Sequence, residues 1–357
     1  MTLVWFLAGL AALVVGAELL VRGASRLALA WGLSPLVVGL TVVAFGTSAP
    51  ETAVSVGAVF SGRTDIAVGN VVGSNIFNVL FILGVSALIV PLTVARQVIR
   101  QEVPIMIGAS VLLLALGLDG TLSRLDGLWL VGLLIAYTAA LVIQSRREAA
   151  AQAPSDDSSA GHAGGHWAVQ LLLVIGGLAL LVLGSRWLVD AAVTMAQALG
   201  VSDLVIGLTV VAAGTSLPEV ATSVMAAVRG QRDIAVGNVV GSCTFNLLGC
   251  LGLSALLGPQ GLTVAASLLH FDIWVMIAVA FACLPFFFTG RQIARWEGAV
   301  FLAYYAAYTA YLVLRAQHHD ALPAFSHMML GFVLPLTLIT IVVSVIRPSA
   351  RQAPPAG

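Results

Sequence analysis

The chain has 357 residues, of which 60% are hydrophobic and only 9% are charged, and its mean hydropathy is +1.04. A composition this apolar excludes a soluble globular domain and requires a lipid bilayer as the solvent. The formal net charge is zero and the basic residues form no cluster, which argues against a nucleic-acid partner. Cys243, Cys250 and Cys283 lie in apolar runs without metal-finger spacing, so we interpret them as packing residues and expect no prosthetic group.

The apolar runs predict eleven transmembrane helices. A helix needs about 17–25 residues to cross a bilayer. We interpret the first run as a membrane helix and not as a removed signal peptide, because no positive segment precedes it and Glu18 and Arg22 follow where a cleavage site would lie. The predicted helices cover residues 3–29, 33–60, 65–90, 103–118, 126–144, 167–194, 202–228, 233–257, 271–289, 296–315 and 328–346.

The arginines predict the orientation of these helices. The chain has sixteen arginines and no lysine. With the N-terminus outside, twelve arginines fall inside and only four outside, which is a strong positive-inside bias. Two of these twelve, Arg347 and Arg351, fall inside only if the eleventh helix is present. We therefore predict an integral membrane protein with its N-terminus outside and its C-terminus in the cytoplasm.

Two long motifs occur twice in the chain. GLTVVAFGTSAPE at 39–51 recurs as GLTVVAAGTSLPE at 207–219. DIAVGNVVGSNIFN at 65–78 recurs as DIAVGNVVGSCTFN at 233–246, again 168 residues later. The constant offset indicates an internal duplication. Each copy carries five predicted helices, an odd number, so the second copy enters the membrane in the opposite orientation. Such inverted repeats are typical of secondary transporters, which bind substrate where the repeats meet.

The predicted fold class is therefore an all-α integral membrane protein with two inverted five-helix repeats and an eleventh, C-terminal helix. We assign residues 1–145 to the first repeat and 167–316 to the second. Residues 146–166 are rich in Ser, Gly, Asp and Ala, which predicts a flexible cytoplasmic linker. Residues 317–357 form a C-terminal extension that contains the additional helix.

Glu51 and Glu219 end the first duplicated motif and are the main candidate site residues. A carboxylate in an apolar helix is costly without a partner, which makes a functional site the first hypothesis. Hydroxyl and amide side chains recur around each glutamate with the four-residue spacing that places side chains on one helical face. The symmetric positions offer only oxygen, from Ala44, Thr47, Ser48, Glu51, Ser74, Asn78, Ala212, Thr215, Ser216, Glu219, Ser242 and Asn246.

Pro50 and Pro218 predict further oxygen ligands. A proline has no N–H, so within a helix it leaves the carbonyls of Gly46 and Gly214 without their helical partners. Freed carbonyls that line a cavity at membrane depth can bind ions. Calcium, which takes about six to eight oxygens in a flexible geometry, fits this set better than magnesium does. The absence of Cys and His at the symmetric positions disfavours soft transition metals.

The charge of the site predicts exchange. Two ionised glutamates give a charge near −2, which one calcium ion or two sodium ions would neutralise. An empty site would hold two like charges together in a medium of low dielectric constant, so the empty state should be rare. Exchange is therefore favoured over uniport or a leak. This argument leaves open whether sodium or protons are the counter-ion.

The doubled motifs AFGTSAPE/AAGTSLPE and GNVVGSNIFN/GNVVGSCTFN resemble the calcium/cation antiporter superfamily, specifically its prokaryotic sodium/calcium exchanger-like members. The resemblance covers residues 1–316 and implies alternating access driven by a sodium gradient. It also implies a prokaryotic plasma membrane, with calcium, sodium and the lipid bilayer as partners and no obligate protein partner.

The resemblance implies a role for each candidate residue. Glu51 and Glu219 would be the central calcium ligands, completed by Asn78 and Asn246. Oxygens for the centre and for flanking sodium sites would come from Thr47, Thr215, Ala44, Ala212, Ser48, Ser74, Ser216 and Ser242. Asn246 stands where potassium-dependent relatives carry an aspartate, so we do not expect potassium co-transport.

We therefore expect a sodium/calcium antiporter and not an enzyme. A proton-coupled exchanger of calcium or another divalent cation is the main alternative. A membrane hydrolase would need a nucleophile or an activated water beside the glutamates, and no histidine or metal-site motif lies near either of them. A passive channel is disfavoured by the fixed charge of the site and by the inverted halves.

Overall fold

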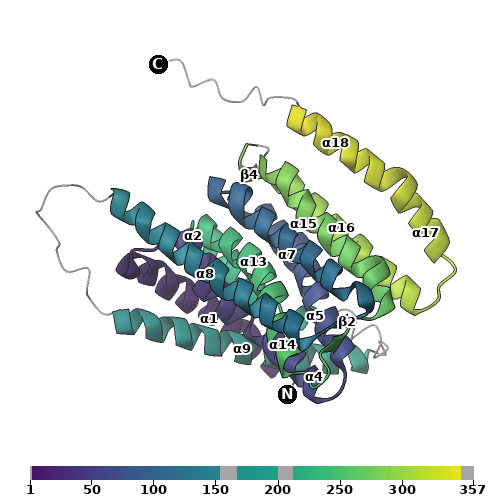
Figure 1. Cartoon of the computed structure of the whole chain (residues 1–357), viewed down its shortest axis with the longest axis horizontal. Coiled ribbons are helices and arrows are strands. Elements are labelled where there is room, and N and C mark those ends of the chain that lie inside the picture. Colours follow the sequence, from purple (N-terminus) through teal and green to yellow (C-terminus); the bar gives the residue numbers. More distant parts are fainter. Residues whose placement is uncertain (1, 153–166, 200–211, 289, 347–357) are drawn as a thin grey trace, which may run out of the picture.

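A computed structural model describes residues 2–152, 167–199, 212–288 and 290–346, and most of them are helical (Figure 1). Within these ranges nine helices are long and apolar enough to cross a membrane. The bent pair Pro35–Thr47 and Ala49–Phe60 provides a tenth span. The remaining predicted helix, 202–228, lies partly outside the described residues. The structure thus confirms ten of the predicted spans, including the C-terminal one at Leu322–Thr340.

The first repeat has five spans, three of which contain π-helical segments. In chain order its elements are α1 (Thr2–Trp31), α2 (Pro35–Val38), η1 (Gly39–Val43), α3 (Ala44–Thr47), α4 (Ala49–Phe60), α5 (Thr64–Phe77), η2 (Asn78–Leu83), α6 (Gly84–Ile89), η3 (Val98–Glu102), α7 (Val103–Leu116), the 3₁₀ turn η4 (Gly117–Asp119) and α8 (Arg124–Gln152).

The second repeat follows the same order. Its elements are α9 (Trp167–Ala198), α11 (Ala212–Gly214), α12 (Leu217–Val228), α13 (Arg232–Phe245), η6 (Asn246–Cys250), α14 (Leu251–Leu257), η7 (Leu268–Asp272), α15 (Ile273–Phe288) and α16 (Arg295–Ala316). The extension consists of α17 (Leu322–Met328), η8 (Met329–Val333) and α18 (Leu334–Ile346).

Helix α8 continues into the segment predicted to be a flexible linker. It ends at Gln152, so residues 146–152 are helical. The physical reason is local: this part of the segment reads RREAAAQ, and these residue types are strong helix formers. The rest of the predicted linker, residues 153–166, lies outside the described residues.

Two very short antiparallel strand pairs add to the predicted all-helical fold. β1 (Leu92–Thr93) pairs with β4 (Gln292–Ile293), and β2 (Thr121–Leu122) pairs with β3 (Leu262–Thr263). Each pair joins a loop of one repeat to a loop of the other. Because β1 follows the third span and β2 follows the fourth, the two pairs connect the repeats at opposite ends of the helices.

The first helices of the two repeats, α1 and α9, lie side by side (Figure 1). Glycines form their contact. A Cβ added to Gly16 would lie 2.8 Å from the Gly177 carbonyl oxygen, and a Cβ added to Gly177 would lie 2.7 Å from the Gly16 carbonyl oxygen. Gly9 and Gly184 make the same reciprocal approach. Small residues at these positions therefore let the two backbones touch.

Helix α13 belongs to the most buried of the described membrane spans and lies at the centre of the bundle. Every residue from Ile234 to Phe245 is buried. Gly237 and Gly241 bring it against η1 and α2, since a Cβ at Gly241 would lie 2.6 Å from the Leu40 carbonyl oxygen. This contact sets the second-repeat motif on α13 directly against the first-repeat motif on η1 and α3.

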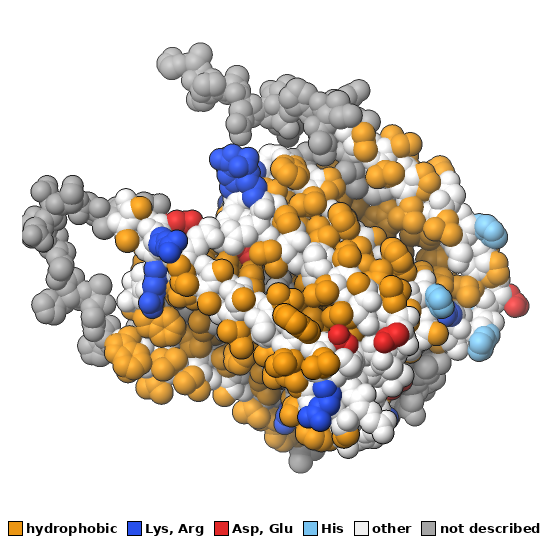
Figure 2. Space-filling view, viewed as in Figure 1, with side chains coloured by type: hydrophobic (Ala, Val, Ile, Leu, Met, Phe, Trp, Pro, Cys, Tyr) orange, Lys and Arg blue, Asp and Glu red, His pale blue; other side chains and the backbone are white. Residues whose placement is uncertain are grey.

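The C-terminal extension lies at the edge of the bundle, beside α15 and α16 (Figure 1). The Tyr304 hydroxyl donates a hydrogen bond of 2.6 Å to the Thr337 hydroxyl. No residue of α17 or η8 is buried. Figure 2 shows a face of the molecule covered largely by hydrophobic side chains with few charged ones, as a protein surrounded by lipid requires.

Candidate cation site between the repeats

Each candidate glutamate lies in the first turn of a short helix. Helix α3 ends at Thr47, α4 begins at Ala49, and the two segments are bent by 43°. Pro50 therefore lies at the start of α4, where its missing N–H costs no helical hydrogen bond, and not inside a continuous helix. In the second repeat, α12 likewise begins with Pro218 in its first turn. The free N–H groups and the dipole at such helix starts favour a carboxylate there.

The two glutamates are joined crosswise by serines of the opposite repeat. The Ser48 hydroxyl donates a hydrogen bond of 3.0 Å to Glu219 Oε1. The Ser216 hydroxyl donates one of 2.7 Å to Glu51 Oε1. All four side chains are fully buried. The structure thus brings the motif at 39–51 and the described part of its copy into direct contact.

Several oxygens around this contact have no hydrogen-bond partner among the described residues. The second carboxylate oxygen of each glutamate is one of them. The other candidate-site atoms in this state are Ser74 Oγ, Thr215 Oγ1, Asn78 Oδ1, Asn78 Nδ2 and Asn246 Oδ1. Buried polar atoms without partners cost free energy, so this concentration of unpartnered oxygens fits a site that binds a cation.

Thr47 connects the first-repeat motif on α3 to α13 of the second repeat. Its hydroxyl lies 3.1 Å from Asn238 Oδ1, 3.3 Å from the Ala44 carbonyl oxygen and 3.5 Å from the Ser242 hydroxyl. The structure thereby brings Ala44, Thr47 and Ser242 together. Ala212 is placed in α11, but its side chain lies outside the described part of the chain.

The expectation of a free carbonyl at Gly214 is wrong. The Ser185 hydroxyl of α9 donates a hydrogen bond of 2.6 Å to this oxygen. The lost helical partner is therefore replaced by a side chain from the first helix of the same repeat. Sequence spacing does not reveal this contact, because the serine lies 29 residues earlier.

Asn70 and Asn238 support the site but were not among the residues selected from the sequence. Asn238 Nδ2 donates to the Ser223 hydroxyl at 2.9 Å and to the Glu219 carbonyl oxygen at 3.4 Å. Asn70 Nδ2 makes the equivalent bonds, of 3.0 Å to the Ser55 hydroxyl and 3.2 Å to the Glu51 carbonyl oxygen. The sequence signal that could have identified these two residues is the asparagine that GNVVGS carries in both repeats.

Asn78 and Asn246 begin π-helical segments at equivalent points of the repeats. Segment η2 packs against α12, which carries Glu219, and η6 packs against α4, which carries Glu51. Single π-helical turns within α-helices are frequent at functional sites. Each asparagine therefore belongs to a segment that contacts the glutamate-bearing helix of the opposite repeat.

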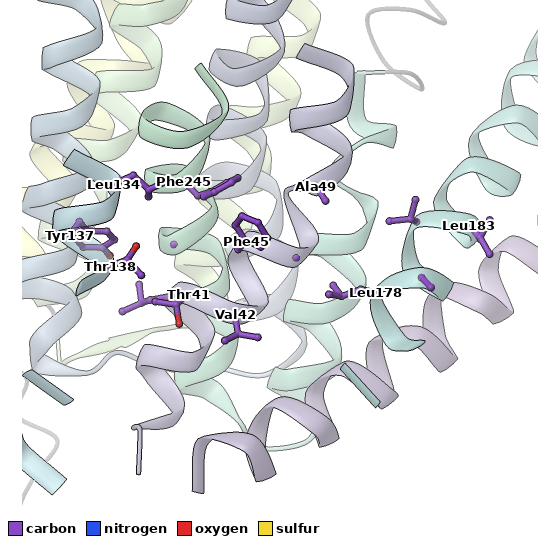
Figure 3. Close-up of a pocket in the computed structure, with 15 residues that line it drawn as sticks. Thr41, Val42, Phe45, Ala49, Leu134, Tyr137, Thr138, Leu178, Leu183 and Phe245 are labelled. Atoms are coloured by element: carbon purple, nitrogen blue, oxygen red, sulfur yellow. The ribbon is translucent and has the colours of Figure 1, made fainter. Parts of the chain in front are cut away.

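A cavity of about 740 Å³ lies beside these residues, between η1, α3, α8, α9 and α13. Its lining is mainly apolar, and the rings of Phe45 and Phe245 meet edge to face across it with centroids 5.1 Å apart (Figure 3). The hydroxyls of Thr41, Tyr137 and Thr138 are its few polar groups. This lining does not suit a bare cation, so the oxygen cluster is the better candidate site.

The described residues contain no cluster of three or more His, Cys, Asp and Glu side chains that could hold a metal ion. The candidate site instead combines two carboxylates with neutral hydroxyl, amide and carbonyl oxygens. Such a site suits a hard cation that exchanges readily and not a tightly held transition metal.

Comparison with known proteins identifies the family. Residues 1–143 and 169–314 match the model of the sodium/calcium exchanger protein family, and the chain therefore belongs to this family. It is an integral membrane protein of a family of antiporters.

Two relatives match most of the chain. The sodium/calcium exchanger MaX1 of Methanosarcina acetivorans is 36% identical in an alignment of 340 residues, and the match covers 86% of this chain and 97% of that protein. The putative antiporter CaxA of Alkalimonas amylolytica is 38% identical in an alignment of 315 residues, and the match covers 85% of this chain and 96% of the relative.

The fold also matches a solved structure of the sodium-calcium exchanger NCX_Mj. The TM-score is 0.74 with 32% sequence identity, and the match covers 87% of this chain and 98% of that one. This match, together with the duplicated motifs, confirms the predicted fold class of two inverted five-helix repeats.

Proposed function

We propose that the chain exchanges calcium for sodium by alternating access, and that Glu51 and Glu219 form the centre of its cation site. The observation that carries the proposal is the crossed pair of hydrogen bonds between Ser48 and Glu219 and between Ser216 and Glu51. It buries two carboxylates together between inverted repeats. Each carboxylate keeps one oxygen that has no hydrogen-bond partner among the described residues.

Calcium suits this site for reasons of charge and ligand type. Two ionised carboxylates balance the charge of one calcium ion. Neutral oxygens complete a coordination of about six to eight, which calcium accepts in flexible geometry. The proposed ligand set comprises Glu51, Glu219, Asn78, Asn246, Thr47 and Thr215, with Ala44, Ala212, Ser48, Ser74, Ser216 and Ser242 at flanking sodium positions.

Sodium is the proposed counter-ion. Two sodium ions neutralise the same two carboxylates, and both ions prefer oxygen ligands, so one site can serve both in turn. An empty site would leave two carboxylates facing each other in a medium of low dielectric constant, which disfavours reorientation without an ion. The relatives include proteins named as sodium/calcium exchangers, which supports this choice.

The proposal includes an arrangement in the membrane. We place the protein in a prokaryotic plasma membrane with its N-terminus outside and its C-terminus in the cytoplasm, on the basis of the arginine distribution. Residues 1–145 and 167–316 are the two repeats, residues 146–166 connect them on the cytoplasmic side, and residues 317–357 form the extension.

Ion flux into proteoliposomes tests the function. The purified chain is reconstituted with sodium inside, diluted into sodium-free buffer that contains radioactive calcium, and compared with vesicles that have no sodium gradient. We expect calcium uptake only with the outward sodium gradient. Uptake that follows a pH gradient and ignores sodium would instead establish a proton-coupled exchanger, and uptake without any gradient would indicate a channel.

A further inference from the structure

The second duplicated motif differs between the repeats at two adjacent pairs of equivalent positions, 75/243 and 76/244. In the first pair, position 75 is asparagine and position 243 is cysteine, and these two residues contact each other. Asn75 Nδ2 donates a hydrogen bond of 3.2 Å to the Cys243 carbonyl oxygen. The Cys243 thiol lies 3.9 Å from the Asn75 carbonyl oxygen. The departure from repeat symmetry is thus located where α5 and α13 meet.

The Cys243 carbonyl determines how the Asn75 amide is oriented. A carbonyl oxygen can only accept a hydrogen bond, so the NH₂ group of Asn75 must face it. The weak acceptor Met276 Sδ lies on the same side, 3.8 Å from Asn75 Nδ2. The Asn75 side-chain oxygen therefore points away from both acceptors.

That oxygen in turn orients Asn246. Asn246 Nδ2 donates a hydrogen bond of 3.3 Å to Asn75 Oδ1. The opposite orientation would place two amide oxygens against each other. Asn246 is fully buried, and its own Oδ1 has no partner among the described residues. The contact therefore leaves an oxygen, and not an NH₂ group, as the free end of the Asn246 side chain.

The equivalent asparagine of the first repeat has no such support. Asn78 is also fully buried, but neither its Oδ1 nor its Nδ2 has a hydrogen-bond partner in the described part of the chain. By the symmetry of the repeats, Cys243 is the residue that would support Asn78 as Asn75 supports Asn246. Its thiol, however, is only a weak hydrogen-bonding group. The two asparagines of the site are therefore not equivalent.

We propose that Asn75 is a positioning residue that holds the Asn246 amide with its oxygen toward the cation, so that the second repeat supplies a preoriented neutral ligand. This inference rests on the proposed function. Without Asn75 the Asn246 amide can rotate and present its NH₂ group, which repels a cation. Partners that orient metal ligands are typically worth about 10–100-fold in metal affinity.

The test is the calcium dependence of exchange by Asn75→Leu, which has a similar volume but neither hydrogen-bonding group. We expect the KM for calcium to rise about 10-fold or more, while turnover at saturating calcium changes by less than about twofold because the preoriented ligand acts through binding. Asn75→Ala serves as a second variant if the leucine side chain prevents folding. A wild-type KM in both variants overturns the inference.

Cys243→Ala is the matched control. It removes the thiol but keeps the backbone carbonyl that orients Asn75, so we expect a KM within about twofold of the wild-type value, since only a weak hydrogen-bonding group is lost. An increase as large as that of Asn75→Leu would show that packing between α5 and α13, and not amide orientation, controls calcium binding.

A second set of variants, made in the Asn246→Asp protein, distinguishes a loss of amide orientation from a general packing defect. In Asn246→Asp the two carboxylate oxygens are equivalent, so rotation no longer changes what the cation meets. Adding Asn75→Leu to that background should not raise the KM by more than about twofold, because no orientation is left to lose and the carboxylate cannot donate a hydrogen bond to Asn75 Oδ1. An undiminished effect overturns the proposal. Calcium flux by the wild-type protein in the same vesicles distinguishes this failure from a failure of the proposed function.

Discussion

Ser216 of the second repeat donates a hydrogen bond of 2.7 Å to Glu51 of the first, across 165 residues of sequence. The reciprocal bond from Ser48 to Glu219 is 3.0 Å long. Each serine directly precedes the short helix that carries the glutamate of its own repeat. A shift of either helix therefore changes the surroundings of both carboxylates, which links ion binding to the relative position of the repeats.

Replacing either glutamate with glutamine should abolish sodium-driven calcium exchange. Glu51→Gln or Glu219→Gln removes one of the two negative charges, and the amide presents an NH₂ group to the cation in a site that excludes water. Calcium uptake in proteoliposomes measures the effect. Glu148→Gln, on the exposed end of α8, is the control and should exchange at the wild-type rate. Normal uptake by Glu51→Gln would contradict the site assignment.

Ser216→Ala should weaken calcium binding without preventing folding. A hydrogen bond to a charged group is worth about 1.5–3 kcal/mol, which corresponds to an increase of about 10-fold or more in the KM for calcium. Ser48→Ala should have a smaller effect because its bond is longer. Ser61→Ala removes an exposed hydroxyl that bonds only to its own helix, and it should leave the KM unchanged. Equal effects of Ser61→Ala and Ser216→Ala would argue against the crossed bonds.

Much of this arrangement could be predicted from the sequence, because the relevant signals are local or repeated. Hydropathy located ten spans that the structure contains. The constant offset between the motifs implied the inverted halves and paired Glu51 with Glu219. Both inferences need only the order of residues and the thickness of a bilayer.

The contacts that the sequence did not reveal join residues far apart in the chain. The break at Ser48 depends on how α3 and α4 pack, although Pro50 marked its vicinity. The Ser185 bond to Gly214 and the bonds of Asn238 depend on which helices become neighbours. The Asn246 amide donates a hydrogen bond to Asn75 of the other repeat, and Asn75 in turn donates one to the Cys243 carbonyl. Neither contact can be read from spacing along the chain.

Asn238→Ala should destabilise the protein more than Asn70→Ala. Asn238 is fully buried and connects Thr47, Ser223 and the Glu219 carbonyl, so its removal leaves several buried groups without partners. The expected cost is about 1–3 kcal/mol. Asn70 is only half-buried and makes two such bonds, so water can replace part of what it provides. The thermal midpoints of both variants in detergent give the comparison, and an equal loss would contradict it.

Deletion of residues 317–357 should leave a folded and active exchanger. The extension lies at the edge of the bundle, and its described hydrogen bond to the core joins Tyr304 to Thr337. The match to the exchanger family ends at residue 314, before the extension begins. Calcium uptake and thermal midpoint measure the effect of the truncation. Tyr304→Phe tests the hydrogen bond alone and should cost no more than about 1.5 kcal/mol. Loss of uptake by a truncated chain that still folds would assign the extension a role in exchange.

Adjacent glycines on α9 provide the sharpest test of the contact between the two repeats. A Cβ at Gly177 would lie 2.7 Å from the Gly16 carbonyl oxygen and from the Leu20 nitrogen, whereas a Cβ at Gly176 meets nothing within 4 Å among the described residues. Gly177→Ala must therefore push α1 away from α9, and overpacking of this kind costs about 1–3 kcal/mol. Gly176→Ala makes the same change one residue away. It should be neutral or slightly stabilising, because alanine favours the helix. The thermal midpoint should fall for Gly177→Ala alone, and a similar fall for both variants would show that helix propensity, and not the close approach of α1 and α9, sets the requirement for glycine.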